Sequence, residues 1–172
     1  DPGYETADLF TFQIAPESES LVDGPSYAQF HTSFRDRLAA LPGVESVGLV
    51  ENVPLNEGTA QGRFQTEEMS AQGEDGALLN FTFADGNYFP TVGIEVLRGR
   101  VFEEADHVSA FGNIILSRTA AELLWPGRDP IGRRLRASPQ PGASRTDDMR
   151  VWQTVVGVVE DVIQQRAEEG FR

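Results

Sequence analysis

The chain has 172 residues, with 14 Lys or Arg against 27 Asp or Glu, so its formal net charge is −13. This balance argues against a nucleic-acid-binding protein, because phosphate affinity needs a concentrated positive surface. The absence of Cys excludes disulfides, thiolate zinc sites and iron–sulfur clusters. No run of about 18 apolar residues predicts a membrane span. The chain opens at Asp1 rather than Met, so we expect it to be a piece of a longer protein.

The first part of the chain predicts a strand, a helix and a second strand. Phe10, Phe12 and Ile14 alternate with polar residues, as in a half-buried strand. An apolar stripe at helical spacing follows, made of Tyr27, Phe30, Phe34, Leu38 and Leu41. Apolar residues at intervals between 44 and 53 indicate the second strand. This order favours a right-handed β-α-β crossover with the helix packed on a sheet.

The middle of the chain is more polar. Residues 56–76 are Gly-rich and predict a loop or a weak edge strand, with Phe64 as the main apolar residue. Strand character returns at residues 78–83. Residues 88–92 then predict one or two helical turns.

The last part again alternates strands and a helix. Residues 113–116 predict a short strand, and Ser117 is placed to cap the helix that follows. Residues 137–148 predict a long exposed loop. The run 152–159 is the most strand-prone of the chain, and we expect it to be buried on at least one face.

Four potential metal ligands lie close together in the sequence: Glu103, Glu104, Asp106 and His107. On a helix, three of them would share a face and could hold a divalent cation through carboxylate oxygens and one imidazole. The other interpretation is a solvated acidic turn. We favour the turn, because the segment lacks the Asp-x-Asp-x-Asp-Gly order of a calcium loop.

The densest basic group consists of Arg128, Arg133, Arg134 and Arg136. Such a group could hold a phosphate or an anionic partner through bidentate contacts. The interpretation we favour is a cation-rich sheet surface that neutralises part of the acidic excess. No Gly-Lys-Ser or Gly-Lys-Thr sequence follows, so a phosphate-binding loop is not predicted.

No grouping of residues predicts catalysis. The chain has two His and no Gly-x-Ser-x-Gly elbow, and His31 lies beside the apolar helix stripe. Asp147 and Asp148 lie in the loop-like stretch, without the burial that paired catalytic carboxylates need. We interpret Trp125 and Trp152 as core anchors. We therefore predict no catalytic, cofactor-binding or metal-binding residue and no enzyme.

Five sequence blocks occur together and in a fixed order. They are residues 87–94 (NYFPTVGI), 97–102 (LRGRVF), 114–127 (IILSRTAAELLWPG), 129–134 (DPIGRR) and 154–162 (TVVGVVEDV). In this order the chain resembles the MacB-like periplasmic core domain of FtsX-like permeases from ATP-binding-cassette (ABC) systems. The resemblance runs from residue 1 to about 162. It departs from the family at Arg118, where relatives usually carry an acidic or amide residue, and in a long loop at 138–148.

The resemblance implies an α+β fold. A porter-like β-α-β subdomain would comprise residues 1–55 and the C-terminal part of the chain. A small inserted α/β subdomain of the Sabre type would comprise about 56–149. The whole region, residues 1–172, would lie between the first and second transmembrane helices of a permease. Its place would be the periplasmic side of a bacterial inner membrane.

The resemblance also implies a function without catalysis. The domain would transmit ATPase-driven conformational change to envelope partners or substrate, in export, lipoprotein release or cell-wall regulation. Its partners would be the permease's transmembrane helices, a cytoplasmic ATPase and a periplasmic adaptor or substrate protein, with no nucleic acid and no cofactor. We expect the isolated domain to be a monomer, because the dimer contact would come mainly from membrane and ATPase parts.

Two alternatives remain open from the sequence. One is a small-molecule-binding or peptide-binding module with a cleft between the subdomains. A thermal-shift screen would distinguish it, since a ligand raises the melting temperature by mass action. The other is a metal-dependent hydrolase built on Glu103, Asp106 and His107, which elemental analysis without stoichiometric metal would exclude.

Overall fold

The computed structural model describes residues 8–14, 24–52, 60–108, 112–138 and 150–162. The side chains of 24–28 and of 107–108 lie outside this description. In the described part, no helix combines the length and the apolar character that crossing a bilayer requires.

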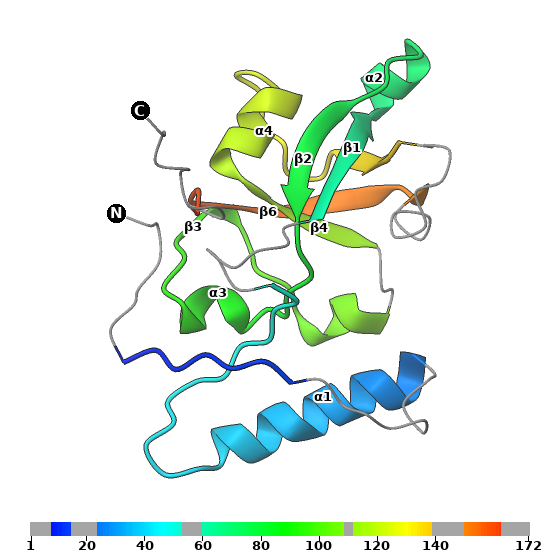
Figure 1. Cartoon of the computed structure of the whole chain (residues 1–172). Helices are drawn as coiled ribbons and strands as arrows, with labels where there is room; N and C mark the ends of the chain where they lie inside the picture. Colours follow the sequence, from blue (N-terminus) through cyan, green and yellow to red (C-terminus); the bar gives the residue numbers. More distant parts are fainter. Residues whose placement is uncertain (1–7, 15–23, 53–59, 109–111, 139–149, 163–172) are drawn as a thin grey trace, which may run out of the picture.

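Strand β6 (Gln153–Val159) lies at the centre of a six-stranded sheet (Figure 1). Its β-branched residues favour extended backbone and pack well on a pleated surface. β4 (Asn113–Ser117) runs parallel to it along its length. β5 (Arg134–Ala137) pairs antiparallel with its first residues, and β3 (Val96–Gly99) with its last. Because a strand has two edges, β5 and β3 follow one another along the edge opposite β4.

A hairpin extends the sheet beyond β5. β1 (Ala60–Thr66) pairs antiparallel with both β5 and β2 (Ala77–Phe81), and α2 (Glu67–Ala71) lies at the hairpin tip (Figure 1). The prediction of a loop or weak edge strand is therefore wrong for this segment. β1 is an interior strand, and Phe64 is only 1% exposed. The strand forms because its neighbours bury it, although its own sequence is polar.

Two apolar clusters lie on the two faces of the sheet. Alternation along β4 places Leu116 in one cluster and Ile115 against the other. α4 (Arg118–Leu124) covers the first cluster, which includes Phe64, Leu116, Leu124, Trp125, Leu135, Val155 and Val158. α3 (Tyr88–Thr91) contributes Tyr88 and Phe89 to the second cluster. The other buried members of this cluster are Val92, Ile94 and Val159. The expected helical turns at 88–92 and the core position of Trp125 are confirmed.

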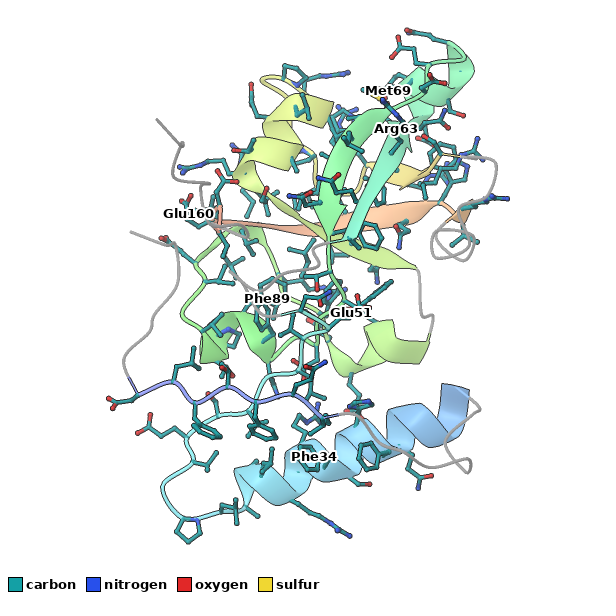
Figure 2. All side chains as sticks on the ribbon, viewed as in Figure 1. Phe34, Glu51, Arg63, Met69, Phe89 and Glu160 are labelled. Carbon is teal, nitrogen blue, oxygen red and sulfur yellow. The ribbon has the colours of Figure 1, made fainter. Side chains whose placement is uncertain are left out.

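Helix α1 (Gly24–Ala39) forms a separate layer below the sheet in Figure 1. Its aromatic residues Phe30 and Phe34 are half-buried and stack with ring centroids 6.0 Å apart. Phe12 of the segment 8–14 meets Phe34 edge-on at 6.1 Å. Figure 2 shows Phe34 on this layer and Phe89 in the body above it. The predicted helix is confirmed, but its neighbour is the segment 8–14 rather than a sheet.

The predicted β-α-β crossover is wrong in the described residues. The segment 9–14 forms no strand, and Phe10 is 83% exposed. The segment 44–52 contributes only an isolated antiparallel bridge between Val50 and Ala84. Two backbone hydrogen bonds flank that bridge, from Asp85 N–H to Leu49 and from Glu51 N–H to Phe83. The apolar pattern therefore overestimated the burial of residues 9–14 and did not specify which backbone the two segments would pair with.

The α+β class is confirmed, since helices alternate with a largely antiparallel sheet. The strands predicted at 113–116 and 152–159 are confirmed as β4 and β6. The Ser117 hydroxyl accepts a hydrogen bond from Ala120 N–H at 3.3 Å, so the predicted helix cap is also confirmed. The loop predicted from 137 begins later, because Ala137 is fully buried in β5. Residues 139–148, with Asp147 and Asp148, lie outside the described residues.

Candidate functional site

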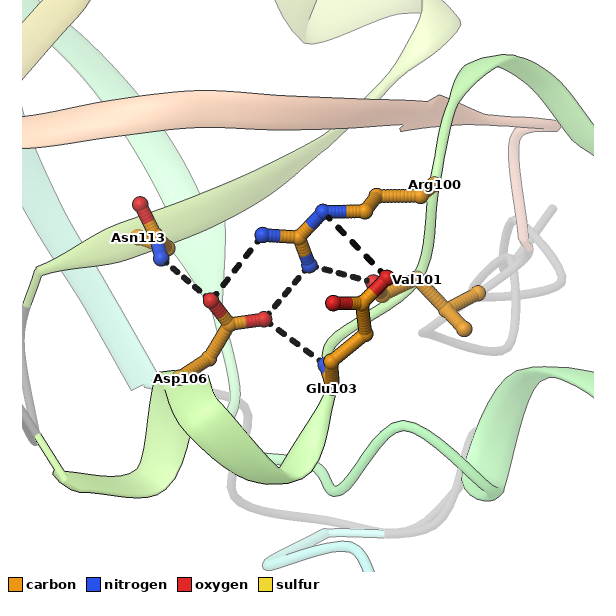
Figure 3. A network of polar contacts seen from close by, with 5 residues as sticks. All are labelled: Arg100, Val101, Glu103, Asp106 and Asn113. Carbon is orange, nitrogen blue, oxygen red and sulfur yellow. Dashed lines mark hydrogen bonds and ion pairs between the residues drawn. The ribbon is translucent and has the colours of Figure 1, made fainter.

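An ion pair between Arg100 and Asp106 joins the end of β3 to the 3₁₀ helix η2 (Glu104–Val108) (Figure 3). The two guanidinium nitrogens Nη1 and Nη2 donate to the two carboxylate oxygens at 2.6 and 3.0 Å. The Glu103 N–H donates to the same carboxylate at 2.7 Å, and the Asn113 amide at 2.5 Å. One carboxylate thus fastens β3, η2 and β4 to one another.

These donors change the acidity of the pair. The Arg100 hydrogen bonds hold the pKa of Asp106 well below its usual range, although burial alone would raise it. The hydrogen bonds from Glu103 N–H and from Asn113 lower this pKa further. The same hydrogen bonds, donated by Arg100 to the Asp106 carboxylate, raise the pKa of Arg100. Asp106 is therefore a permanently ionised anchor at neutral pH.

This geometry favours the acidic-turn interpretation of residues 103–107. Both oxygens of Asp106 already accept hydrogen bonds, so the carboxylate has little capacity left for a cation. No group of three or more Asp, Glu, His or Cys in the described part of the chain is arranged to hold a metal. Glu103 lies 3.7 Å from Arg100, while the His107 side chain is outside the description. The described residues of this segment form an ion-paired turn.

A second network forms where the predicted basic group meets α2. Glu68 lies 3.5 Å from both Arg128 and Arg133, and Glu67 pairs with Arg134. The pKa of Glu68 is lowered mainly by a hydrogen bond from the backbone N–H of Glu68 itself, and further by Thr66 and Arg128. The four arginines are thus brought together, as predicted, and the acidic residues that face them come from the hairpin tip.

Arg136 completes this network and corrects one prediction. Its guanidinium donates to the Ser70 hydroxyl at 2.9 Å and lies 4.6 Å from the centroid of the Trp152 ring. Arg134 lies over the same ring at 5.9 Å. Trp152 is therefore a half-buried platform for two cations rather than a core anchor.

Asp85 connects the α1 layer to the body. Its Oδ1 accepts hydrogen bonds from Leu49 N–H at 3.0 Å and from Tyr88 N–H, at the start of α3, at 2.9 Å. Its Oδ2 faces Arg35 of α1 at 3.6 Å. Asp85 is only 8% exposed, so α1 supplies the countercharge of a buried carboxylate.

Asp161 forms a similar connection just beyond β6. It accepts hydrogen bonds from the N–H and the hydroxyl of Thr119, at 2.9 and 2.8 Å, in the first turn of α4. Burial alone would raise the pKa of Asp161, but the bonds from Thr119 and Ser117 and the nearby Arg118 outweigh it, and the pKa is lowered. Arg118 also pairs with Glu160, which lies at the end of β6 (Figure 2). Arg118 thus links the start of α4 to the residues just beyond β6.

Sequence reasoning missed Asp85 and Asp161. Leu49 lies 36 residues from Asp85 and Thr119 lies 42 residues from Asp161, so local spacing could not reveal these two connections. His31 lies on the flank of α1 beside Phe30, as predicted, and partial burial lowers its pKa. The described polar side chains thus form connections between elements.

Comparison with known proteins supplies the context of these connections. A family model described as "MacB-like periplasmic core domain" matches residues 3–171. No curated protein matches the sequence.

Two solved structures share the fold. The periplasmic region of MacB from Actinobacillus actinomycetemcomitans matches at a TM-score of 0.52 and 16% identity, over 78% of this chain and 52% of that one. The extracellular domain of the noncanonic ABC-type transporter YknZ from Gram-positive bacteria matches at a TM-score of 0.51 and 17% identity, over 77% and 58%. The chain therefore spans little more than half of either solved domain.

Proposed function

Because the chain belongs to the family of MacB-like periplasmic core domains of ABC transporter permeases, we propose that it transmits ATPase-driven conformational change across the membrane. The movement would reach envelope partners or substrate, in export, lipoprotein release or cell-wall regulation. The family is one of transporter domains rather than enzymes. In this proposal the domain moves and docks, and makes or breaks no covalent bond.

The observation that carries the proposal is the position of β6. It pairs with β3, β4 and β5, so the strand shares backbone hydrogen bonds with most of the sheet. Asp161 and Glu160, just beyond its end, are bonded to α4 through Thr119 and Arg118. A displacement applied to the chain beyond Asp161 is therefore passed to a sheet and a helix together. A stiffly connected body of this kind transmits movement instead of absorbing it.

The α1 layer supports the proposed division into two subdomains. α1 packs against residues 8–14 and is tied to the body by the pair of Arg35 and Asp85. Elements of the first 55 residues therefore associate with one another, which supports residues 1–55 as part of one proposed subdomain. The other proposed subdomain, at about 56–149, would carry β1 to β5 and the helices between them, and β6 from the C-terminal part completes its sheet.

We further propose the partners of the whole protein. They would be the permease's transmembrane helices, a cytoplasmic ATPase and a periplasmic adaptor or substrate protein, with this domain on the extracytoplasmic side of a bacterial inner membrane. The two solved relatives are described as periplasmic and extracellular regions, which supports that side. The isolated domain would be a monomer.

Limited proteolysis and crosslinking of the full-length permease with its ATPase test the proposal. We expect cleavage and crosslinks in residues 1–172 to change on addition of a non-hydrolysable ATP analogue. An ATPase variant that cannot bind nucleotide serves as the control and should show no change. Identical patterns with and without the analogue would show that the domain is not coupled to the ATPase.

A further inference from the structure

The four arginines Arg128, Arg133, Arg134 and Arg136, here called the arginine surface, converge on the short helix α2. They are the largest concentration of positive charge in a chain whose net charge is −13. Positive charge held together in an acidic protein repels itself, so the grouping needs anionic neighbours. In this structure those neighbours come from the same chain.

The side chains of α2 show how the arginine surface holds carboxylates. Glu67 pairs with Arg134, and Glu68 lies between Arg128 and Arg133 at 3.5 Å from each. Two adjacent glutamates of a polypeptide thus fit three of the arginines at once. An acidic segment of another protein offers the same groups at the same spacing.

The hold of α2 on the arginine surface is weak. The side chains of Arg128, Arg133 and Arg134 remain 51%, 36% and 50% exposed, and Glu67 and Glu68 are 48% and 47% exposed. Ion pairs exposed to this extent contribute little, because water screens them. Glu68 also serves two arginines with one carboxylate. The surface therefore keeps accessible area, and its arginines outnumber the two glutamates of α2 that face them.

We propose that the arginine surface is a docking site for an acidic segment of a partner protein. Glu67 and Glu68 act as a tethered competitor that the partner's carboxylates displace. Cation–π contacts with the Trp152 ring hold Arg134 and Arg136, so their guanidinium groups are pre-positioned. The inference rests on the proposed function only for the existence of a partner protein, since the arginines themselves indicate that its segment is acidic.

A protein segment fits this surface better than an anionic membrane. A bilayer presents an extended negative surface, which would repel the acidic remainder of the chain. A short acidic peptide contacts the arginine surface alone, and distant charges beyond about 8–10 Å are screened at physiological salt. The local positive charge therefore decides the outcome for the peptide but not for the membrane.

Fluorescence anisotropy with a labelled octaglutamate peptide tests the proposal on the chain of 172 residues. The variant Glu67→Gln/Glu68→Gln should bind the peptide about three- to tenfold more tightly than wild type, since removing two exposed competitors has an effect of that order. Glu45→Gln/Glu95→Gln is the matched control, because it changes the net charge equally at exposed positions elsewhere. It should leave the affinity within about twofold of wild type.

A second pair of variants compares an arginine of this surface with an arginine elsewhere. Arg134→Gln should weaken peptide binding severalfold, whereas Arg37→Gln, on the exposed side of α1, should not. Circular dichroism would confirm that each variant is folded. Equal affinity of wild type and Glu67→Gln/Glu68→Gln, or equal effects of the two arginine changes, would overturn the proposal. Binding of anionic phosphatidylglycerol vesicles in preference to the peptide would also overturn it. Because these experiments use the chain of 172 residues alone, none of the three contrary results would bear on the coupling to the ATPase.

Discussion

In the middle of β6 the neighbouring backbone leaves no room for a side chain at position 157. A Cβ built on Gly157 would lie 2.2 Å from the carbonyl oxygen of Arg100 and 3.5 Å from the Ile115 side chain. Gly127, after α4, has a φ of +64° and no atom within 4 Å of the corresponding position. The two glycines of the family motifs therefore serve different needs, close approach at one and backbone conformation at the other.

Replacing each glycine with Ala separates these needs. Gly157→Ala should destabilise the fold by about 2–4 kcal/mol, because the backbone of β3 would have to move. Gly127→Ala should cost about 1 kcal/mol, since only the left-handed conformation is strained. Urea denaturation measures both free energies of unfolding. A Gly157→Ala variant as stable as Gly127→Ala would contradict the packing described for β6.

Asp106 is the second position at which a single residue decides local structure. Asp106→Asn keeps the size of the side chain but removes the charge that Arg100 requires. We expect a loss of about 1–3 kcal/mol, because Asp106 is buried while Arg100 is partly solvated. Glu104→Gln is the control in the same 3₁₀ helix, on an exposed side chain, and should be neutral. Equal stability of the two variants would contradict an anchoring role.

The depressed pKa of Asp106 sets the direction of a pH dependence. The ionised carboxylate favours the folded state, so its contribution is complete above the ordinary Asp value near 3.8 and is lost as the pH falls through the folded value. Wild type should lose stability on acidification below about pH 4, and Asp106→Asn should lose less over the same range. Chemical denaturation between pH 7 and about pH 2.5 compares them. Parallel curves for the two proteins would contradict the assignment.

At the scale of elements, α4 depends on a residue outside itself. Asp161 accepts the Thr119 N–H in the first turn, where backbone donors have no partner within the helix. The charge of Asp161 also complements the positive end of the helix. Glu160 and Asp161, just beyond β6, and the start of α4 are consequently one structural unit.

Removing this connection should release the first turn of α4. Asp161→Ala should cost about 1 kcal/mol, the usual effect of losing a helix cap, and speed hydrogen exchange at residues 118–121. Asp161→Asn retains an acceptor and should lie between the variant and wild type. Hydrogen-exchange mass spectrometry measures the effect. Unchanged exchange in the Ala variant would show that Ser117 alone caps the helix.

The elements also show what the sequence could predict. α1, β4, β6 and the cap at Ser117 follow from local signals, namely apolar spacing, β-branched residues and capping chemistry. β1 could not be predicted from its own residues, because Gln65 and Thr66 are buried only through the strands on either side. The strand predicted for the segment 9–14 was wrong for the opposite reason. Its alternating Phe residues lie along α1, and periodicity does not specify a hydrogen-bonding partner.

The candidate site was predictable only in part. The arginines and Asp106 are conspicuous in the sequence, but their partners Glu68 and Arg100 convert them from candidate ligands into ion pairs. Asp85 and Asp161 act on residues far along the chain, so their roles require the fold. Local sequence thus identified the charged residues and the tertiary structure determined what they do.

At the scale of the whole molecule, the described residues form a sheet that we expect to be stiff, with an attached helical layer. The sheet is held by β6, the Arg100–Asp106 pair and the Asp161 connection, while α1 is joined mainly through Asp85 and the packing of aromatic rings. A body built in this way should move as a unit when the permease changes state. The same stiffness would place the arginine surface at a defined position relative to the membrane.

Resonance energy transfer in the reconstituted full-length permease tests this claim most directly. The 172 residues contain no Cys, and Leu78 and Leu123 are more than half exposed, so Leu78→Cys and Leu123→Cys provide label positions. Transfer from a label at position 123 to acceptor lipids should change when an ATP analogue binds. Transfer between labels at 78 and 123 should stay constant. No change toward the lipids, or a change confined to the pair within the domain, would contradict a domain that transmits movement as one body.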